Sequence, residues 1–584
     1  MQTGSSFVHS SPISSLSSHD PLASLSSHTI RDAFGPTVQL IADALESRGS
    51  PGTTLQQLIT HLKMRCPPPA RRLGLPAGEQ PTDPESVRAA LLVLVRHGIV
   101  TAENNLHGKS KRTAASKLYR YHPERARWLL RYAKYIDFMK KAVDETAAIV
   151  VQTLLVAGRL RTVDLVVAAA ASDSFCAQPT VTETSGLHAN NREQHQHQHH
   201  HRYTARQQVV ETFYKLVTQG FIHVAKQLTD SDENDDAEAE FESDEPPTKK
   251  IKFTSTDKNN PSNEDPAVLS LLLGNAHYKS TLPVDSLWCV NIAMFHDYLR
   301  AYNIGRLVAE RFGSRVQSCG SLVTAALKYR AFLHHVTAPR EHLSIGASPQ
   351  LTSFTANDLI KFLPKPVLHL MEKKVGGLQH NLQKAWEDLS ELSLHPIVVR
   401  RIGNKSECFE LAASSLVDFA QERIVHQIVL DRHGVVAARV ISILLKHRWL
   451  ESEALAEHAM VPAKDIREVL HTLYRSRYVE MNSFSNLRQH NPSHSIYLWG
   501  VNKARLRRQA SEDITTALWN LRLRRQHEME IGKDWVERAQ QATDTDENDH
   551  EMDRLNYQKF CLGLERLDHA ALQLDDALMA MIDF

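Results

Sequence analysis

Apolar residues recur at helical spacing just before short β-branched and aromatic segments, and this combination occurs four times along the chain. In the last copy, a polar loop over 482–495 separates the apolar segment 478–481 from the aromatic segment 496–499. A helix precedes them, because five apolar residues follow the spacing i, i+3, i+4, i+7 and i+8. These residues are Ile466, Val469, Leu470, Leu473 and Tyr474. A helix, a strand, a loop and a returning strand predict the C-terminal half of a winged helix.

The three earlier copies have the same order of features. Their apolar stripes end near Val95, Val217 and Leu389, and each stripe is followed by a short strand and a returning strand that carries aromatic residues. A polar loop over 104–117 separates the two strands of the first copy. Because the copies are roughly 100 residues apart, longer than a solenoid unit, they predict tandem small domains.

The predicted fold class is therefore mainly α-helical with small β-hairpins. Four tandem, partly extended winged-helix domains precede a C-terminal antiparallel helical hairpin or coiled coil, which the apolar spacing within 503–541 and 555–582 predicts. The predicted boundaries are a disordered Ser-rich tail at 1–33, winged helices at 34–141, 142–300, 301–430 and 431–502, and the hairpin at 503–584.

Two polar segments interrupt the second copy, at about 174–202 and about 229–265, and both are predicted to be disordered. The first ends in a histidine–glutamine run, for which a polar loop is favoured over a metal site. The second is acidic up to Glu245 and then basic. Its Lys249, Lys250 and Lys252 form a candidate nuclear import signal, and a plain linker is the open alternative.

Composition narrows the class of protein. The 584 residues carry a net charge of +1, so there is no overall basic field that would hold nucleic acid. The six cysteines include no Cys-x-x-Cys pair, which argues against a zinc ribbon and a disulfide framework. The serine-rich N-terminus has no apolar core, so no signal peptide is predicted. The most apolar stretch, 146–172, contains three charged residues and predicts two buried helices, with no membrane span.

The motifs that resemble catalytic or ligand-binding sites are incomplete. Residues 107–110 resemble the end of a phosphate-binding loop, but Glu103 occupies the position of the required glycine. Asp544, Asp546 and Asn548 have the spacing of a calcium loop, but Asp549 replaces its glycine. We therefore predict no catalytic residue, no metal site and no cofactor.

Basic residues gather in the loop and returning strand of the first copy, and Glu124 is the one carboxylate among them. Without a base-reading pattern, contact with DNA would be directed at phosphates. A solvated face, or docking on an acidic protein, stays open. In the third copy, the helix before the strands carries Glu387, Asp388 and Glu391, which would repel phosphate. The candidate DNA-backbone residues are Lys109, Lys111, Arg112, Lys117, Arg120 and Arg125, and Arg127, Arg131 and Lys134 follow them.

The chain resembles the family of the winged-helix subunit unique to RNA polymerase III. The match is carried by the turn Ala459-Met460-Val461-Pro462-Ala463-Lys464-Asp465, the strand at 477–479 and the aromatic return at 497–499. Residues 287–296 are similar to the family's strand–helix junction after the second winged helix. The tandem layout and the terminal hairpin extend the resemblance over nearly all of the chain after about residue 34. The N-terminal tail and the histidine–glutamine insert depart from the family.

This resemblance implies a nuclear, non-catalytic subunit of a DNA-directed RNA polymerase that makes small untranslated RNAs such as transfer RNA and 5S ribosomal RNA. The implied partners are the other subunits of its heterotrimer, the clamp of the largest subunit, transcription factor IIIB and promoter DNA held without sequence preference. No membrane contact is implied. Two alternatives stay open: a stand-alone winged-helix transcription factor, and a winged-helix scaffold subunit of a non-transcriptional complex.

Overall fold

In the computed structural model the chain forms two compact units. One consists of Met1–Thr29 together with His296–Phe584, and the other of Ile30–Phe295. Each unit is described by itself. The structure describes residues 21–49, 52–65, 83–104, 117–171, 191–225, 268, 272, 275–284, 286–314, 316, 318–337, 353–374, 376–391, 398–402, 407–484, 496–541 and 550–582.

The unit Ile30–Phe295 begins with a small antiparallel sheet of strand order β1-β3-β2. The apolar stripe predicted on the helix before β2 is confirmed, because Val87, Leu91 and Leu94 are buried there. Proline starts two of the helices, where its missing N–H costs no hydrogen bond. The elements are α2 (Pro36–Arg48), β1 (Thr53–Thr54), α3 (Leu55–Arg65), α4 (Pro84–Arg96), β2 (Val100–Asn104) and β3 (Lys117–Tyr121).

A second sheet, of order β4-β6-β5, follows in the same unit. Its buried Trp288 donates from Nε1 to Thr162 Oγ1 at 2.9 Å, and Thr162 donates to the Pro283 carbonyl at 2.6 Å. The connection from the first sheet is α5 (Pro123–Trp128), η2 (Leu129–Arg131) and α6 (Tyr132–Ala142). The second group is α7 (Glu145–Ala157), β4 (Leu160–Arg161), α8 (Thr162–Ala170), α10 (Asn191–Thr218), β5 (Ile222–Val224), α12 (Ala276–Thr281) and β6 (Leu287–Val290).

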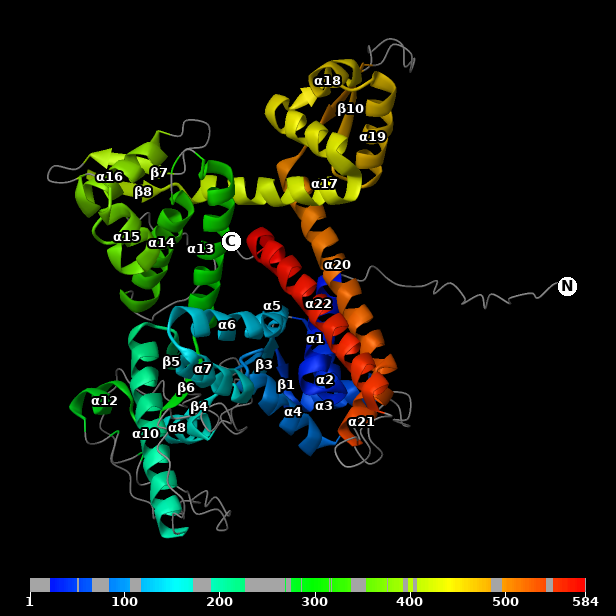
Figure 1. Ribbon diagram of the computed structural model, residues 1–584. Helices are drawn as coiled ribbons and strands as arrows, with labels where there is room; N and C mark the ends of the chain where they lie inside the picture. Colours follow the sequence, from blue (N-terminus) through cyan, green and yellow to red (C-terminus); the bar gives the residue numbers. More distant parts are fainter. Residues whose placement is uncertain are drawn as a thin grey trace, which may run out of the picture. The chain divides into compact units, whose positions relative to one another are not determined.

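A third group lies in the other unit around the strand pair β7–β8. Trp386 is fully buried there between the rings of Phe354 and Phe409, at centroid distances of 5.0 and 6.0 Å. Its elements are α13 (Ile292–Phe312), which begins just before the unit boundary, α14 (Cys319–Phe332), η3 (Leu333–Thr337), η4 (Ile360–Phe362), α15 (Lys365–Glu372), α16 (Gly377–Ser390), β7 (Val398–Ile402) and β8 (Glu407–Leu411), labelled in part in Figure 1.

The last sheet has the order β10-β11-β9, with β11 in the centre. The predicted stripe on the preceding helix is confirmed for Ile466, Leu470 and Leu473, which are fully buried, but Tyr474 is 47% exposed. Tyr474 lies at the edge of the stripe, with its ring near Trp499. The elements are α17 (Ala413–His447), β9 (Trp449–Leu450), α18 (Ser452–Ala459), α19 (Ala463–Arg475), β10 (Glu480–Phe484) and β11 (Ile496–Gly500).

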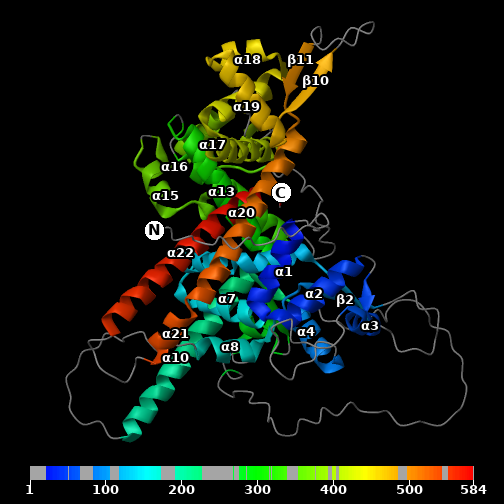
Figure 2. The same ribbon diagram turned by 90° about the vertical axis from the view of Figure 1, so that its right-hand side faces the viewer.

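Two long helices, α20 (Lys503–Ile531) and α22 (His550–Ile582), lie side by side and run in opposite directions, with α21 (Lys533–Gln541) between them in the chain (Figures 1 and 2). Arg525 Nε donates to Asp568 across the pair at 2.7 Å. Apolar residues at helical spacing face inward on α20, among them Leu506, Ile514 and Leu518. This arrangement has the form expected from the apolar spacing of the two segments.

The predicted disordered tail at 1–33 is wrong for residues 21–33, because helix α1 (Pro21–Phe34) begins at Pro21. Its polar residues are accommodated by local hydrogen bonds. Ser26 and Thr29 are buried, and their hydroxyls donate to backbone carbonyls four residues earlier, at 2.9 and 2.7 Å. The buried His28 lies 2.9 Å from Gln526 and edge-on to Trp519, so the serine-rich composition concealed a packed helix.

The predicted disordered inserts are also partly corrected. Helix α10 begins at Asn191, so residues 191–202 of the insert at about 174–202 are helical. Glutamine and arginine in this segment favour helix, which the histidine-rich composition obscured. The segments 174–190 and 229–265 lie outside the described residues. Among the helices that the structure describes, none has the length and apolarity needed to cross a bilayer.

Candidate nucleic-acid interface

Of the candidate DNA contacts in the first group, Lys117 and Arg120 are exposed on β3. Arg120 lies 3.7 Å from Glu103 on the neighbouring strand, and the two side chains are 44% and 55% exposed. An ion pair this exposed is weak, so the Arg120 guanidinium can exchange its carboxylate for a phosphate. These two residues keep the access to solvent that a contact with DNA requires.

Arg125 takes a structural position. Its Nη1 donates to the Gly98 carbonyl at 2.7 Å, and its guanidinium carbon lies 5.9 Å from the centre of the Trp128 ring. Burial lowers the pKa of Arg125, and the nearby Glu124 partly offsets this effect. Because the hydrogen bond holds the turn between α4 and β2, this placement argues against Arg125 as a DNA contact.

Of the remaining basic residues of this run, some are buried, Lys134 on α6 is half-buried, and others lie outside the described residues. Arg127 and Arg131 are only 8% and 3% exposed. Tyr119 and Tyr121 pack against the buried residues around α4. Among the candidates that the structure describes, Lys117 and Arg120 therefore share an exposed strand, and Arg125 does not join them. The candidates Lys109, Lys111 and Arg112, and the candidate import residues Lys249, Lys250 and Lys252, lie outside the described residues.

Helix α19 of the last group carries charges of both signs on its outer face. Lys464, Arg467 and Arg475 are exposed on it, next to Asp465 and Glu468. The exposed Arg467 lies at the 4.0 Å limit of an ion pair with Glu453 of α18. Alternating charges of this kind do not select a polyanion, so α19 is a weak candidate for a DNA contact.

The basic first turns of α20 are engaged within the fold. Lys503 Nζ donates to Glu422 at 2.9 Å, and Arg505 Nη1 donates to Glu480 at 3.1 Å. Arg507 makes a similar bond to Asp418 of α17. These ion pairs connect α20 with α17 and β10, so each of the three cations already faces a carboxylate of the fold, although Lys503 and Arg505 are 54% and 47% exposed.

A second polar cluster surrounds Asp513 of α20. Its carboxylate accepts a hydrogen bond from the Tyr478 hydroxyl and pairs with the Arg432 guanidinium, and Gln509 Nε2 donates to it at 3.2 Å. Burial and the bond to this carboxylate raise the pKa of Tyr478. The cluster fixes the end of α19 against α17 and α20.

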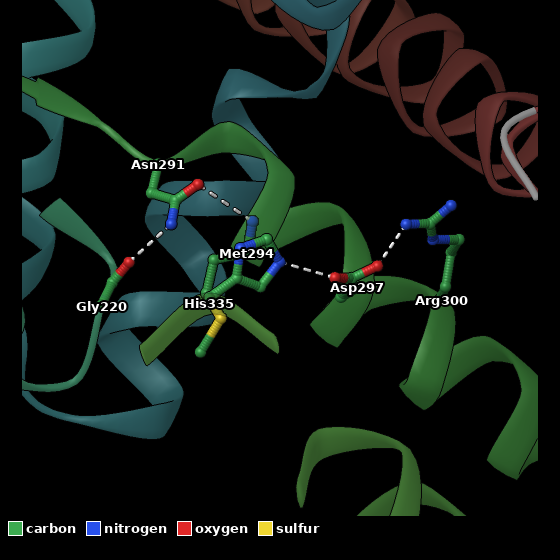
Figure 3. A network of polar contacts seen from close by, with 6 residues as sticks. All are labelled: Gly220, Asn291, Met294, Asp297, Arg300 and His335. Carbon is green, nitrogen blue, oxygen red and sulfur yellow. Dashed lines mark hydrogen bonds and ion pairs between the residues drawn. The ribbon is translucent and has the colours of Figure 1, made fainter. Parts of the chain in front are cut away.

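Figure 3 shows the polar residues at the start of α13. The Asn291 amide donates to the Gly220 carbonyl at 2.8 Å and accepts from the Met294 N–H at 3.4 Å, which caps the helix. One turn later, Asp297 is bound by Arg300 and lies 2.7 Å from His335 Nε2. Burial alone would raise the pKa of Asp297, but the His335 hydrogen bond and the Arg300 charge outweigh it and hold the pKa below its usual range.

The potential ligand atoms of Asp297, His334 and His335 lie within 4.8 Å of one another, close enough to share a metal ion. The three side chains do not fit a metal site, because the Asp297 carboxylate already pairs with the Arg300 guanidinium and with Nε2 of His335. A divalent cation would have to displace the Arg300 guanidinium from Asp297, and it would then be repelled by that guanidinium close by. We conclude that this cluster joins α13 to η3 as an ion-pair network.

A cysteine and a histidine approach each other in the second group, as in a nucleophilic pair. Cys289 Sγ lies 3.3 Å from His223 Nε2. Burial raises the pKa of Cys289 to about 11, so the sulfur stays a protonated thiol at neutral pH. Because the thiolate is the nucleophile, the pair does not have the electrostatics of a catalytic dyad.

The region around the last sheet defines the class of protein. A helix, a strand, two helices and two strands follow one another, and the sheet order places the final strand in the centre, which is a winged helix. Residues 425–501 match the family model described as "POLR3C, C-terminal winged-helix domain". The protein is therefore mostly helical, with small antiparallel sheets and a C-terminal winged-helix domain.

The chain is also similar over most of its length to several proteins that share one name. The chain is 23% identical over 512 residues to the DNA-directed RNA polymerase III subunit RPC3 of Bos taurus, covering 84% of both chains. It is 22% identical to the Homo sapiens subunit of that name, covering 91% of this chain and 95% of the relative. The Danio rerio subunit is 24% identical, over 78% of each chain. The predicted resemblance to the winged-helix subunit of RNA polymerase III is confirmed.

Proposed function

We propose that this chain is a non-catalytic subunit of nuclear DNA-directed RNA polymerase III, which supports promoter binding, promoter opening and initiation of small untranslated RNAs such as 5S ribosomal RNA and transfer RNA. One observation carries the proposal: the likeness to subunits named RPC3 spans nearly the whole chain and includes a matched winged helix. The proposed partners are the other subunits of a heterotrimer, the clamp of the largest subunit, transcription factor IIIB and promoter DNA.

The order of elements supports a repeated docking architecture. The groups around β1–β3–β2 and β4–β6–β5 have the strand order of the C-terminal winged helix, and in the β7–β8 group a bridge from Phe354 to Phe409 takes the place of the missing strand. We infer four winged helices in series. Such modules bind through their outer surfaces, which agrees with a subunit that holds other components together.

Affinity purification of the tagged full-length chain followed by mass spectrometry tests this function. We expect the subunits of RNA polymerase III in stoichiometric amounts, and depletion of the chain should reduce the synthesis of transfer RNA and 5S ribosomal RNA. Purification without a stable partner would instead support a stand-alone transcription factor. Recovery of a different set of subunits would support a scaffold of a non-transcriptional complex, and either result would overturn the proposal.

We also propose that the loop between β2 and β3 contacts the DNA backbone, together with Lys117 and Arg120. Support comes from the exposure of these two side chains and from the density of basic residues in the loop sequence. Neutralising Lys109, Lys111 and Arg112 together should flatten the dependence of DNA affinity on salt. With fewer phosphate contacts, fewer counterions are released from the DNA when the protein binds. An unchanged slope of log K against log salt would refute this contact.

A further inference from the structure

Five exposed lysines lie on and beside α15 and near the middle of α16, and the DNA-contact prediction did not include them. We call them the lysine surface: Lys361, Lys365, Lys373, Lys374 and Lys384. The two helices pack against each other in the group around β7 and β8 (Figure 1). The exposed His369 and His380 lie on the same helices.

Helical spacing explains why these side chains face solvent. Lys365, His369 and Lys373 recur every four residues along α15, whereas Met371 on the opposite side is buried. On α16, Leu382 and Trp386 turn into the core, which leaves Lys384 outside. The apolar core thus fixes which face of each helix carries the lysines.

The lysine surface has little compensating negative charge. Between residues 361 and 384 the sequence contains five lysines and one carboxylate, that of Glu372. Glu372 lies 3.4 Å from His369 Nδ1. Within the described part of the chain, none of the five lysines forms an ion pair. Their charges are therefore available to a partner, unlike those at the start of α20.

Helix stability explains only part of the arrangement of charges. Lys373 and Lys374 follow the end of α15, where the helix dipole favours basic groups. Lys365 in the first turn of α15, and Glu387, Asp388 and Glu391 at or just after the end of α16, instead oppose the dipole. Charges placed against the dipole cost stability, so these four positions are better explained by a partner that meets the lysines.

The residue types indicate the chemistry of that partner. Protein interfaces are enriched in arginine and aromatic residues and depleted in lysine. The lysine surface contains five lysines, no arginine and no exposed aromatic side chain. Lysine acts as a point charge that reaches phosphates in many geometries without reading bases. The surface therefore suits the backbone of a nucleic acid better than a folded protein.

We propose that the lysine surface binds the phosphate backbone of double-stranded DNA, without base specificity. α15 and α16 correspond to the second and third helices of the inferred winged helix, the pair that meets DNA in helix-turn-helix folds. The acidic residues at the end of α16 repel the phosphates of the duplex and so favour its binding at the lysines. The choice of duplex DNA rests on the proposed function, whereas the location of the site rests on the charges alone.

The test uses the purified full-length chain and a fluorescent duplex of arbitrary sequence, titrated over a series of NaCl concentrations. The variant K365Q/K373Q/K384Q should bind more weakly, with a log K against log salt slope shallower by about 1 for each lysine that contacts a phosphate, and so by about 3. The matched control K63Q/K533Q/K559Q removes three other exposed lysines and should leave the slope unchanged. The variant E387Q/D388N/E391Q should bind DNA more tightly.

Three outcomes would overturn the inference. Equal losses in both lysine variants would indicate a response to net charge alone. Unchanged DNA binding together with loss of a polymerase subunit on purification would assign the surface to an acidic protein. Unchanged DNA binding and unchanged assembly would leave the surface without a ligand. Co-purification of the wild-type chain with polymerase III tests the proposed function separately, because the duplex titration requires no other subunit.

Discussion

Two basic regions of this molecule differ in how their sequence relates to their surface. The run from Lys117 to Lys134 is dense in positive charge, yet Arg125, Arg127 and Arg131 are wholly or partly inside the fold. The lysine surface precedes an acidic segment that would repel phosphate, yet its five lysines all face solvent. The comparison teaches that the density of charge along a chain differs from the charge on a surface, because helix period and side-chain type decide which charges are exposed.

Removing the core beneath the lysine surface should have the largest effect. Trp386→Ala should reduce the free energy of unfolding of the β7–β8 group by about 3–5 kcal/mol, because it opens a cavity between Phe354 and Phe409. Hydrogen exchange measured by mass spectrometry should show lost protection over α15 and α16, with no change over β2 and β3 of the other compact unit. Equal protection over α15 and α16 in the variant and the wild type would disprove this dependence.

The second-largest difference between the two regions is expected in the response of their stability to acid. Burial, with a contribution from the nearby Arg96, lowers the pKa of His97 from 6.5 to about 4. Between these two pH values His97 is protonated in the unfolded chain and neutral in the folded chain. The stability of the β1–β3–β2 group is therefore complete above pH 6.5 and falls as the pH drops toward 4. At pH 5 the loss should be about 2 kcal/mol relative to pH 7.

Hydrogen exchange corrected for its intrinsic rate at each pH measures this loss, with the α15–α16 peptides as an internal reference. His97→Gln removes the titrating group and should flatten the pH dependence of the first group. A His97→Gln profile as steep as that of the wild type would show that other groups cause the loss.

A smaller effect is expected for Arg125→Met, which keeps the aliphatic stem and removes the hydrogen bond to the Gly98 carbonyl. A hydrogen bond to a charged donor contributes on the order of 1.5–3 kcal/mol, and partial exposure of Arg125 places the expected loss near the lower end, at about 1.5 kcal/mol. Local exchange in the turn between α4 and β2 should increase, while the salt slope of DNA binding stays the same. A salt slope shallower in the variant than in the wild type would show that Arg125 contacts DNA after all.

The smallest change in stability is expected for Arg120→Gln. Its ion pair with Glu103 is exposed at both ends, so the free energy of unfolding should change by less than about 0.5 kcal/mol. The salt slope of duplex binding should become shallower by about 1 if the side chain neutralises a phosphate. Lys215→Gln, which breaks another exposed pair, serves as the control and should leave the slope unchanged.

The sequence was sufficient where one strong periodicity governs an element. The stripe around Ile466 and Leu470, the two strands after it and the long C-terminal helices were all predicted from spacing. It was insufficient where polar side chains find local partners, as Ser26 and Thr29 do when they bond to their own helix and allow α1 to be buried. The direction of Arg125 was equally hidden, because its acceptor is a backbone carbonyl 27 residues away.

The single interruption of α17 has a consequence for how insertions would be tolerated. Gly434, with φ of 85° and ψ of 179°, is the one non-helical residue between the helix that leaves β8 and the first helix of the C-terminal winged helix. Adding one residue there would change the phase of the following helix by about 100° and its position by about 1.5 Å. Arg432 and Tyr478, which lie on opposite sides of this hinge point in the chain, could then no longer reach Asp513 together. Lengthening a surface loop costs stability only logarithmically, whereas this junction is sensitive both to length and to replacement of Gly434, whose positive φ favours glycine.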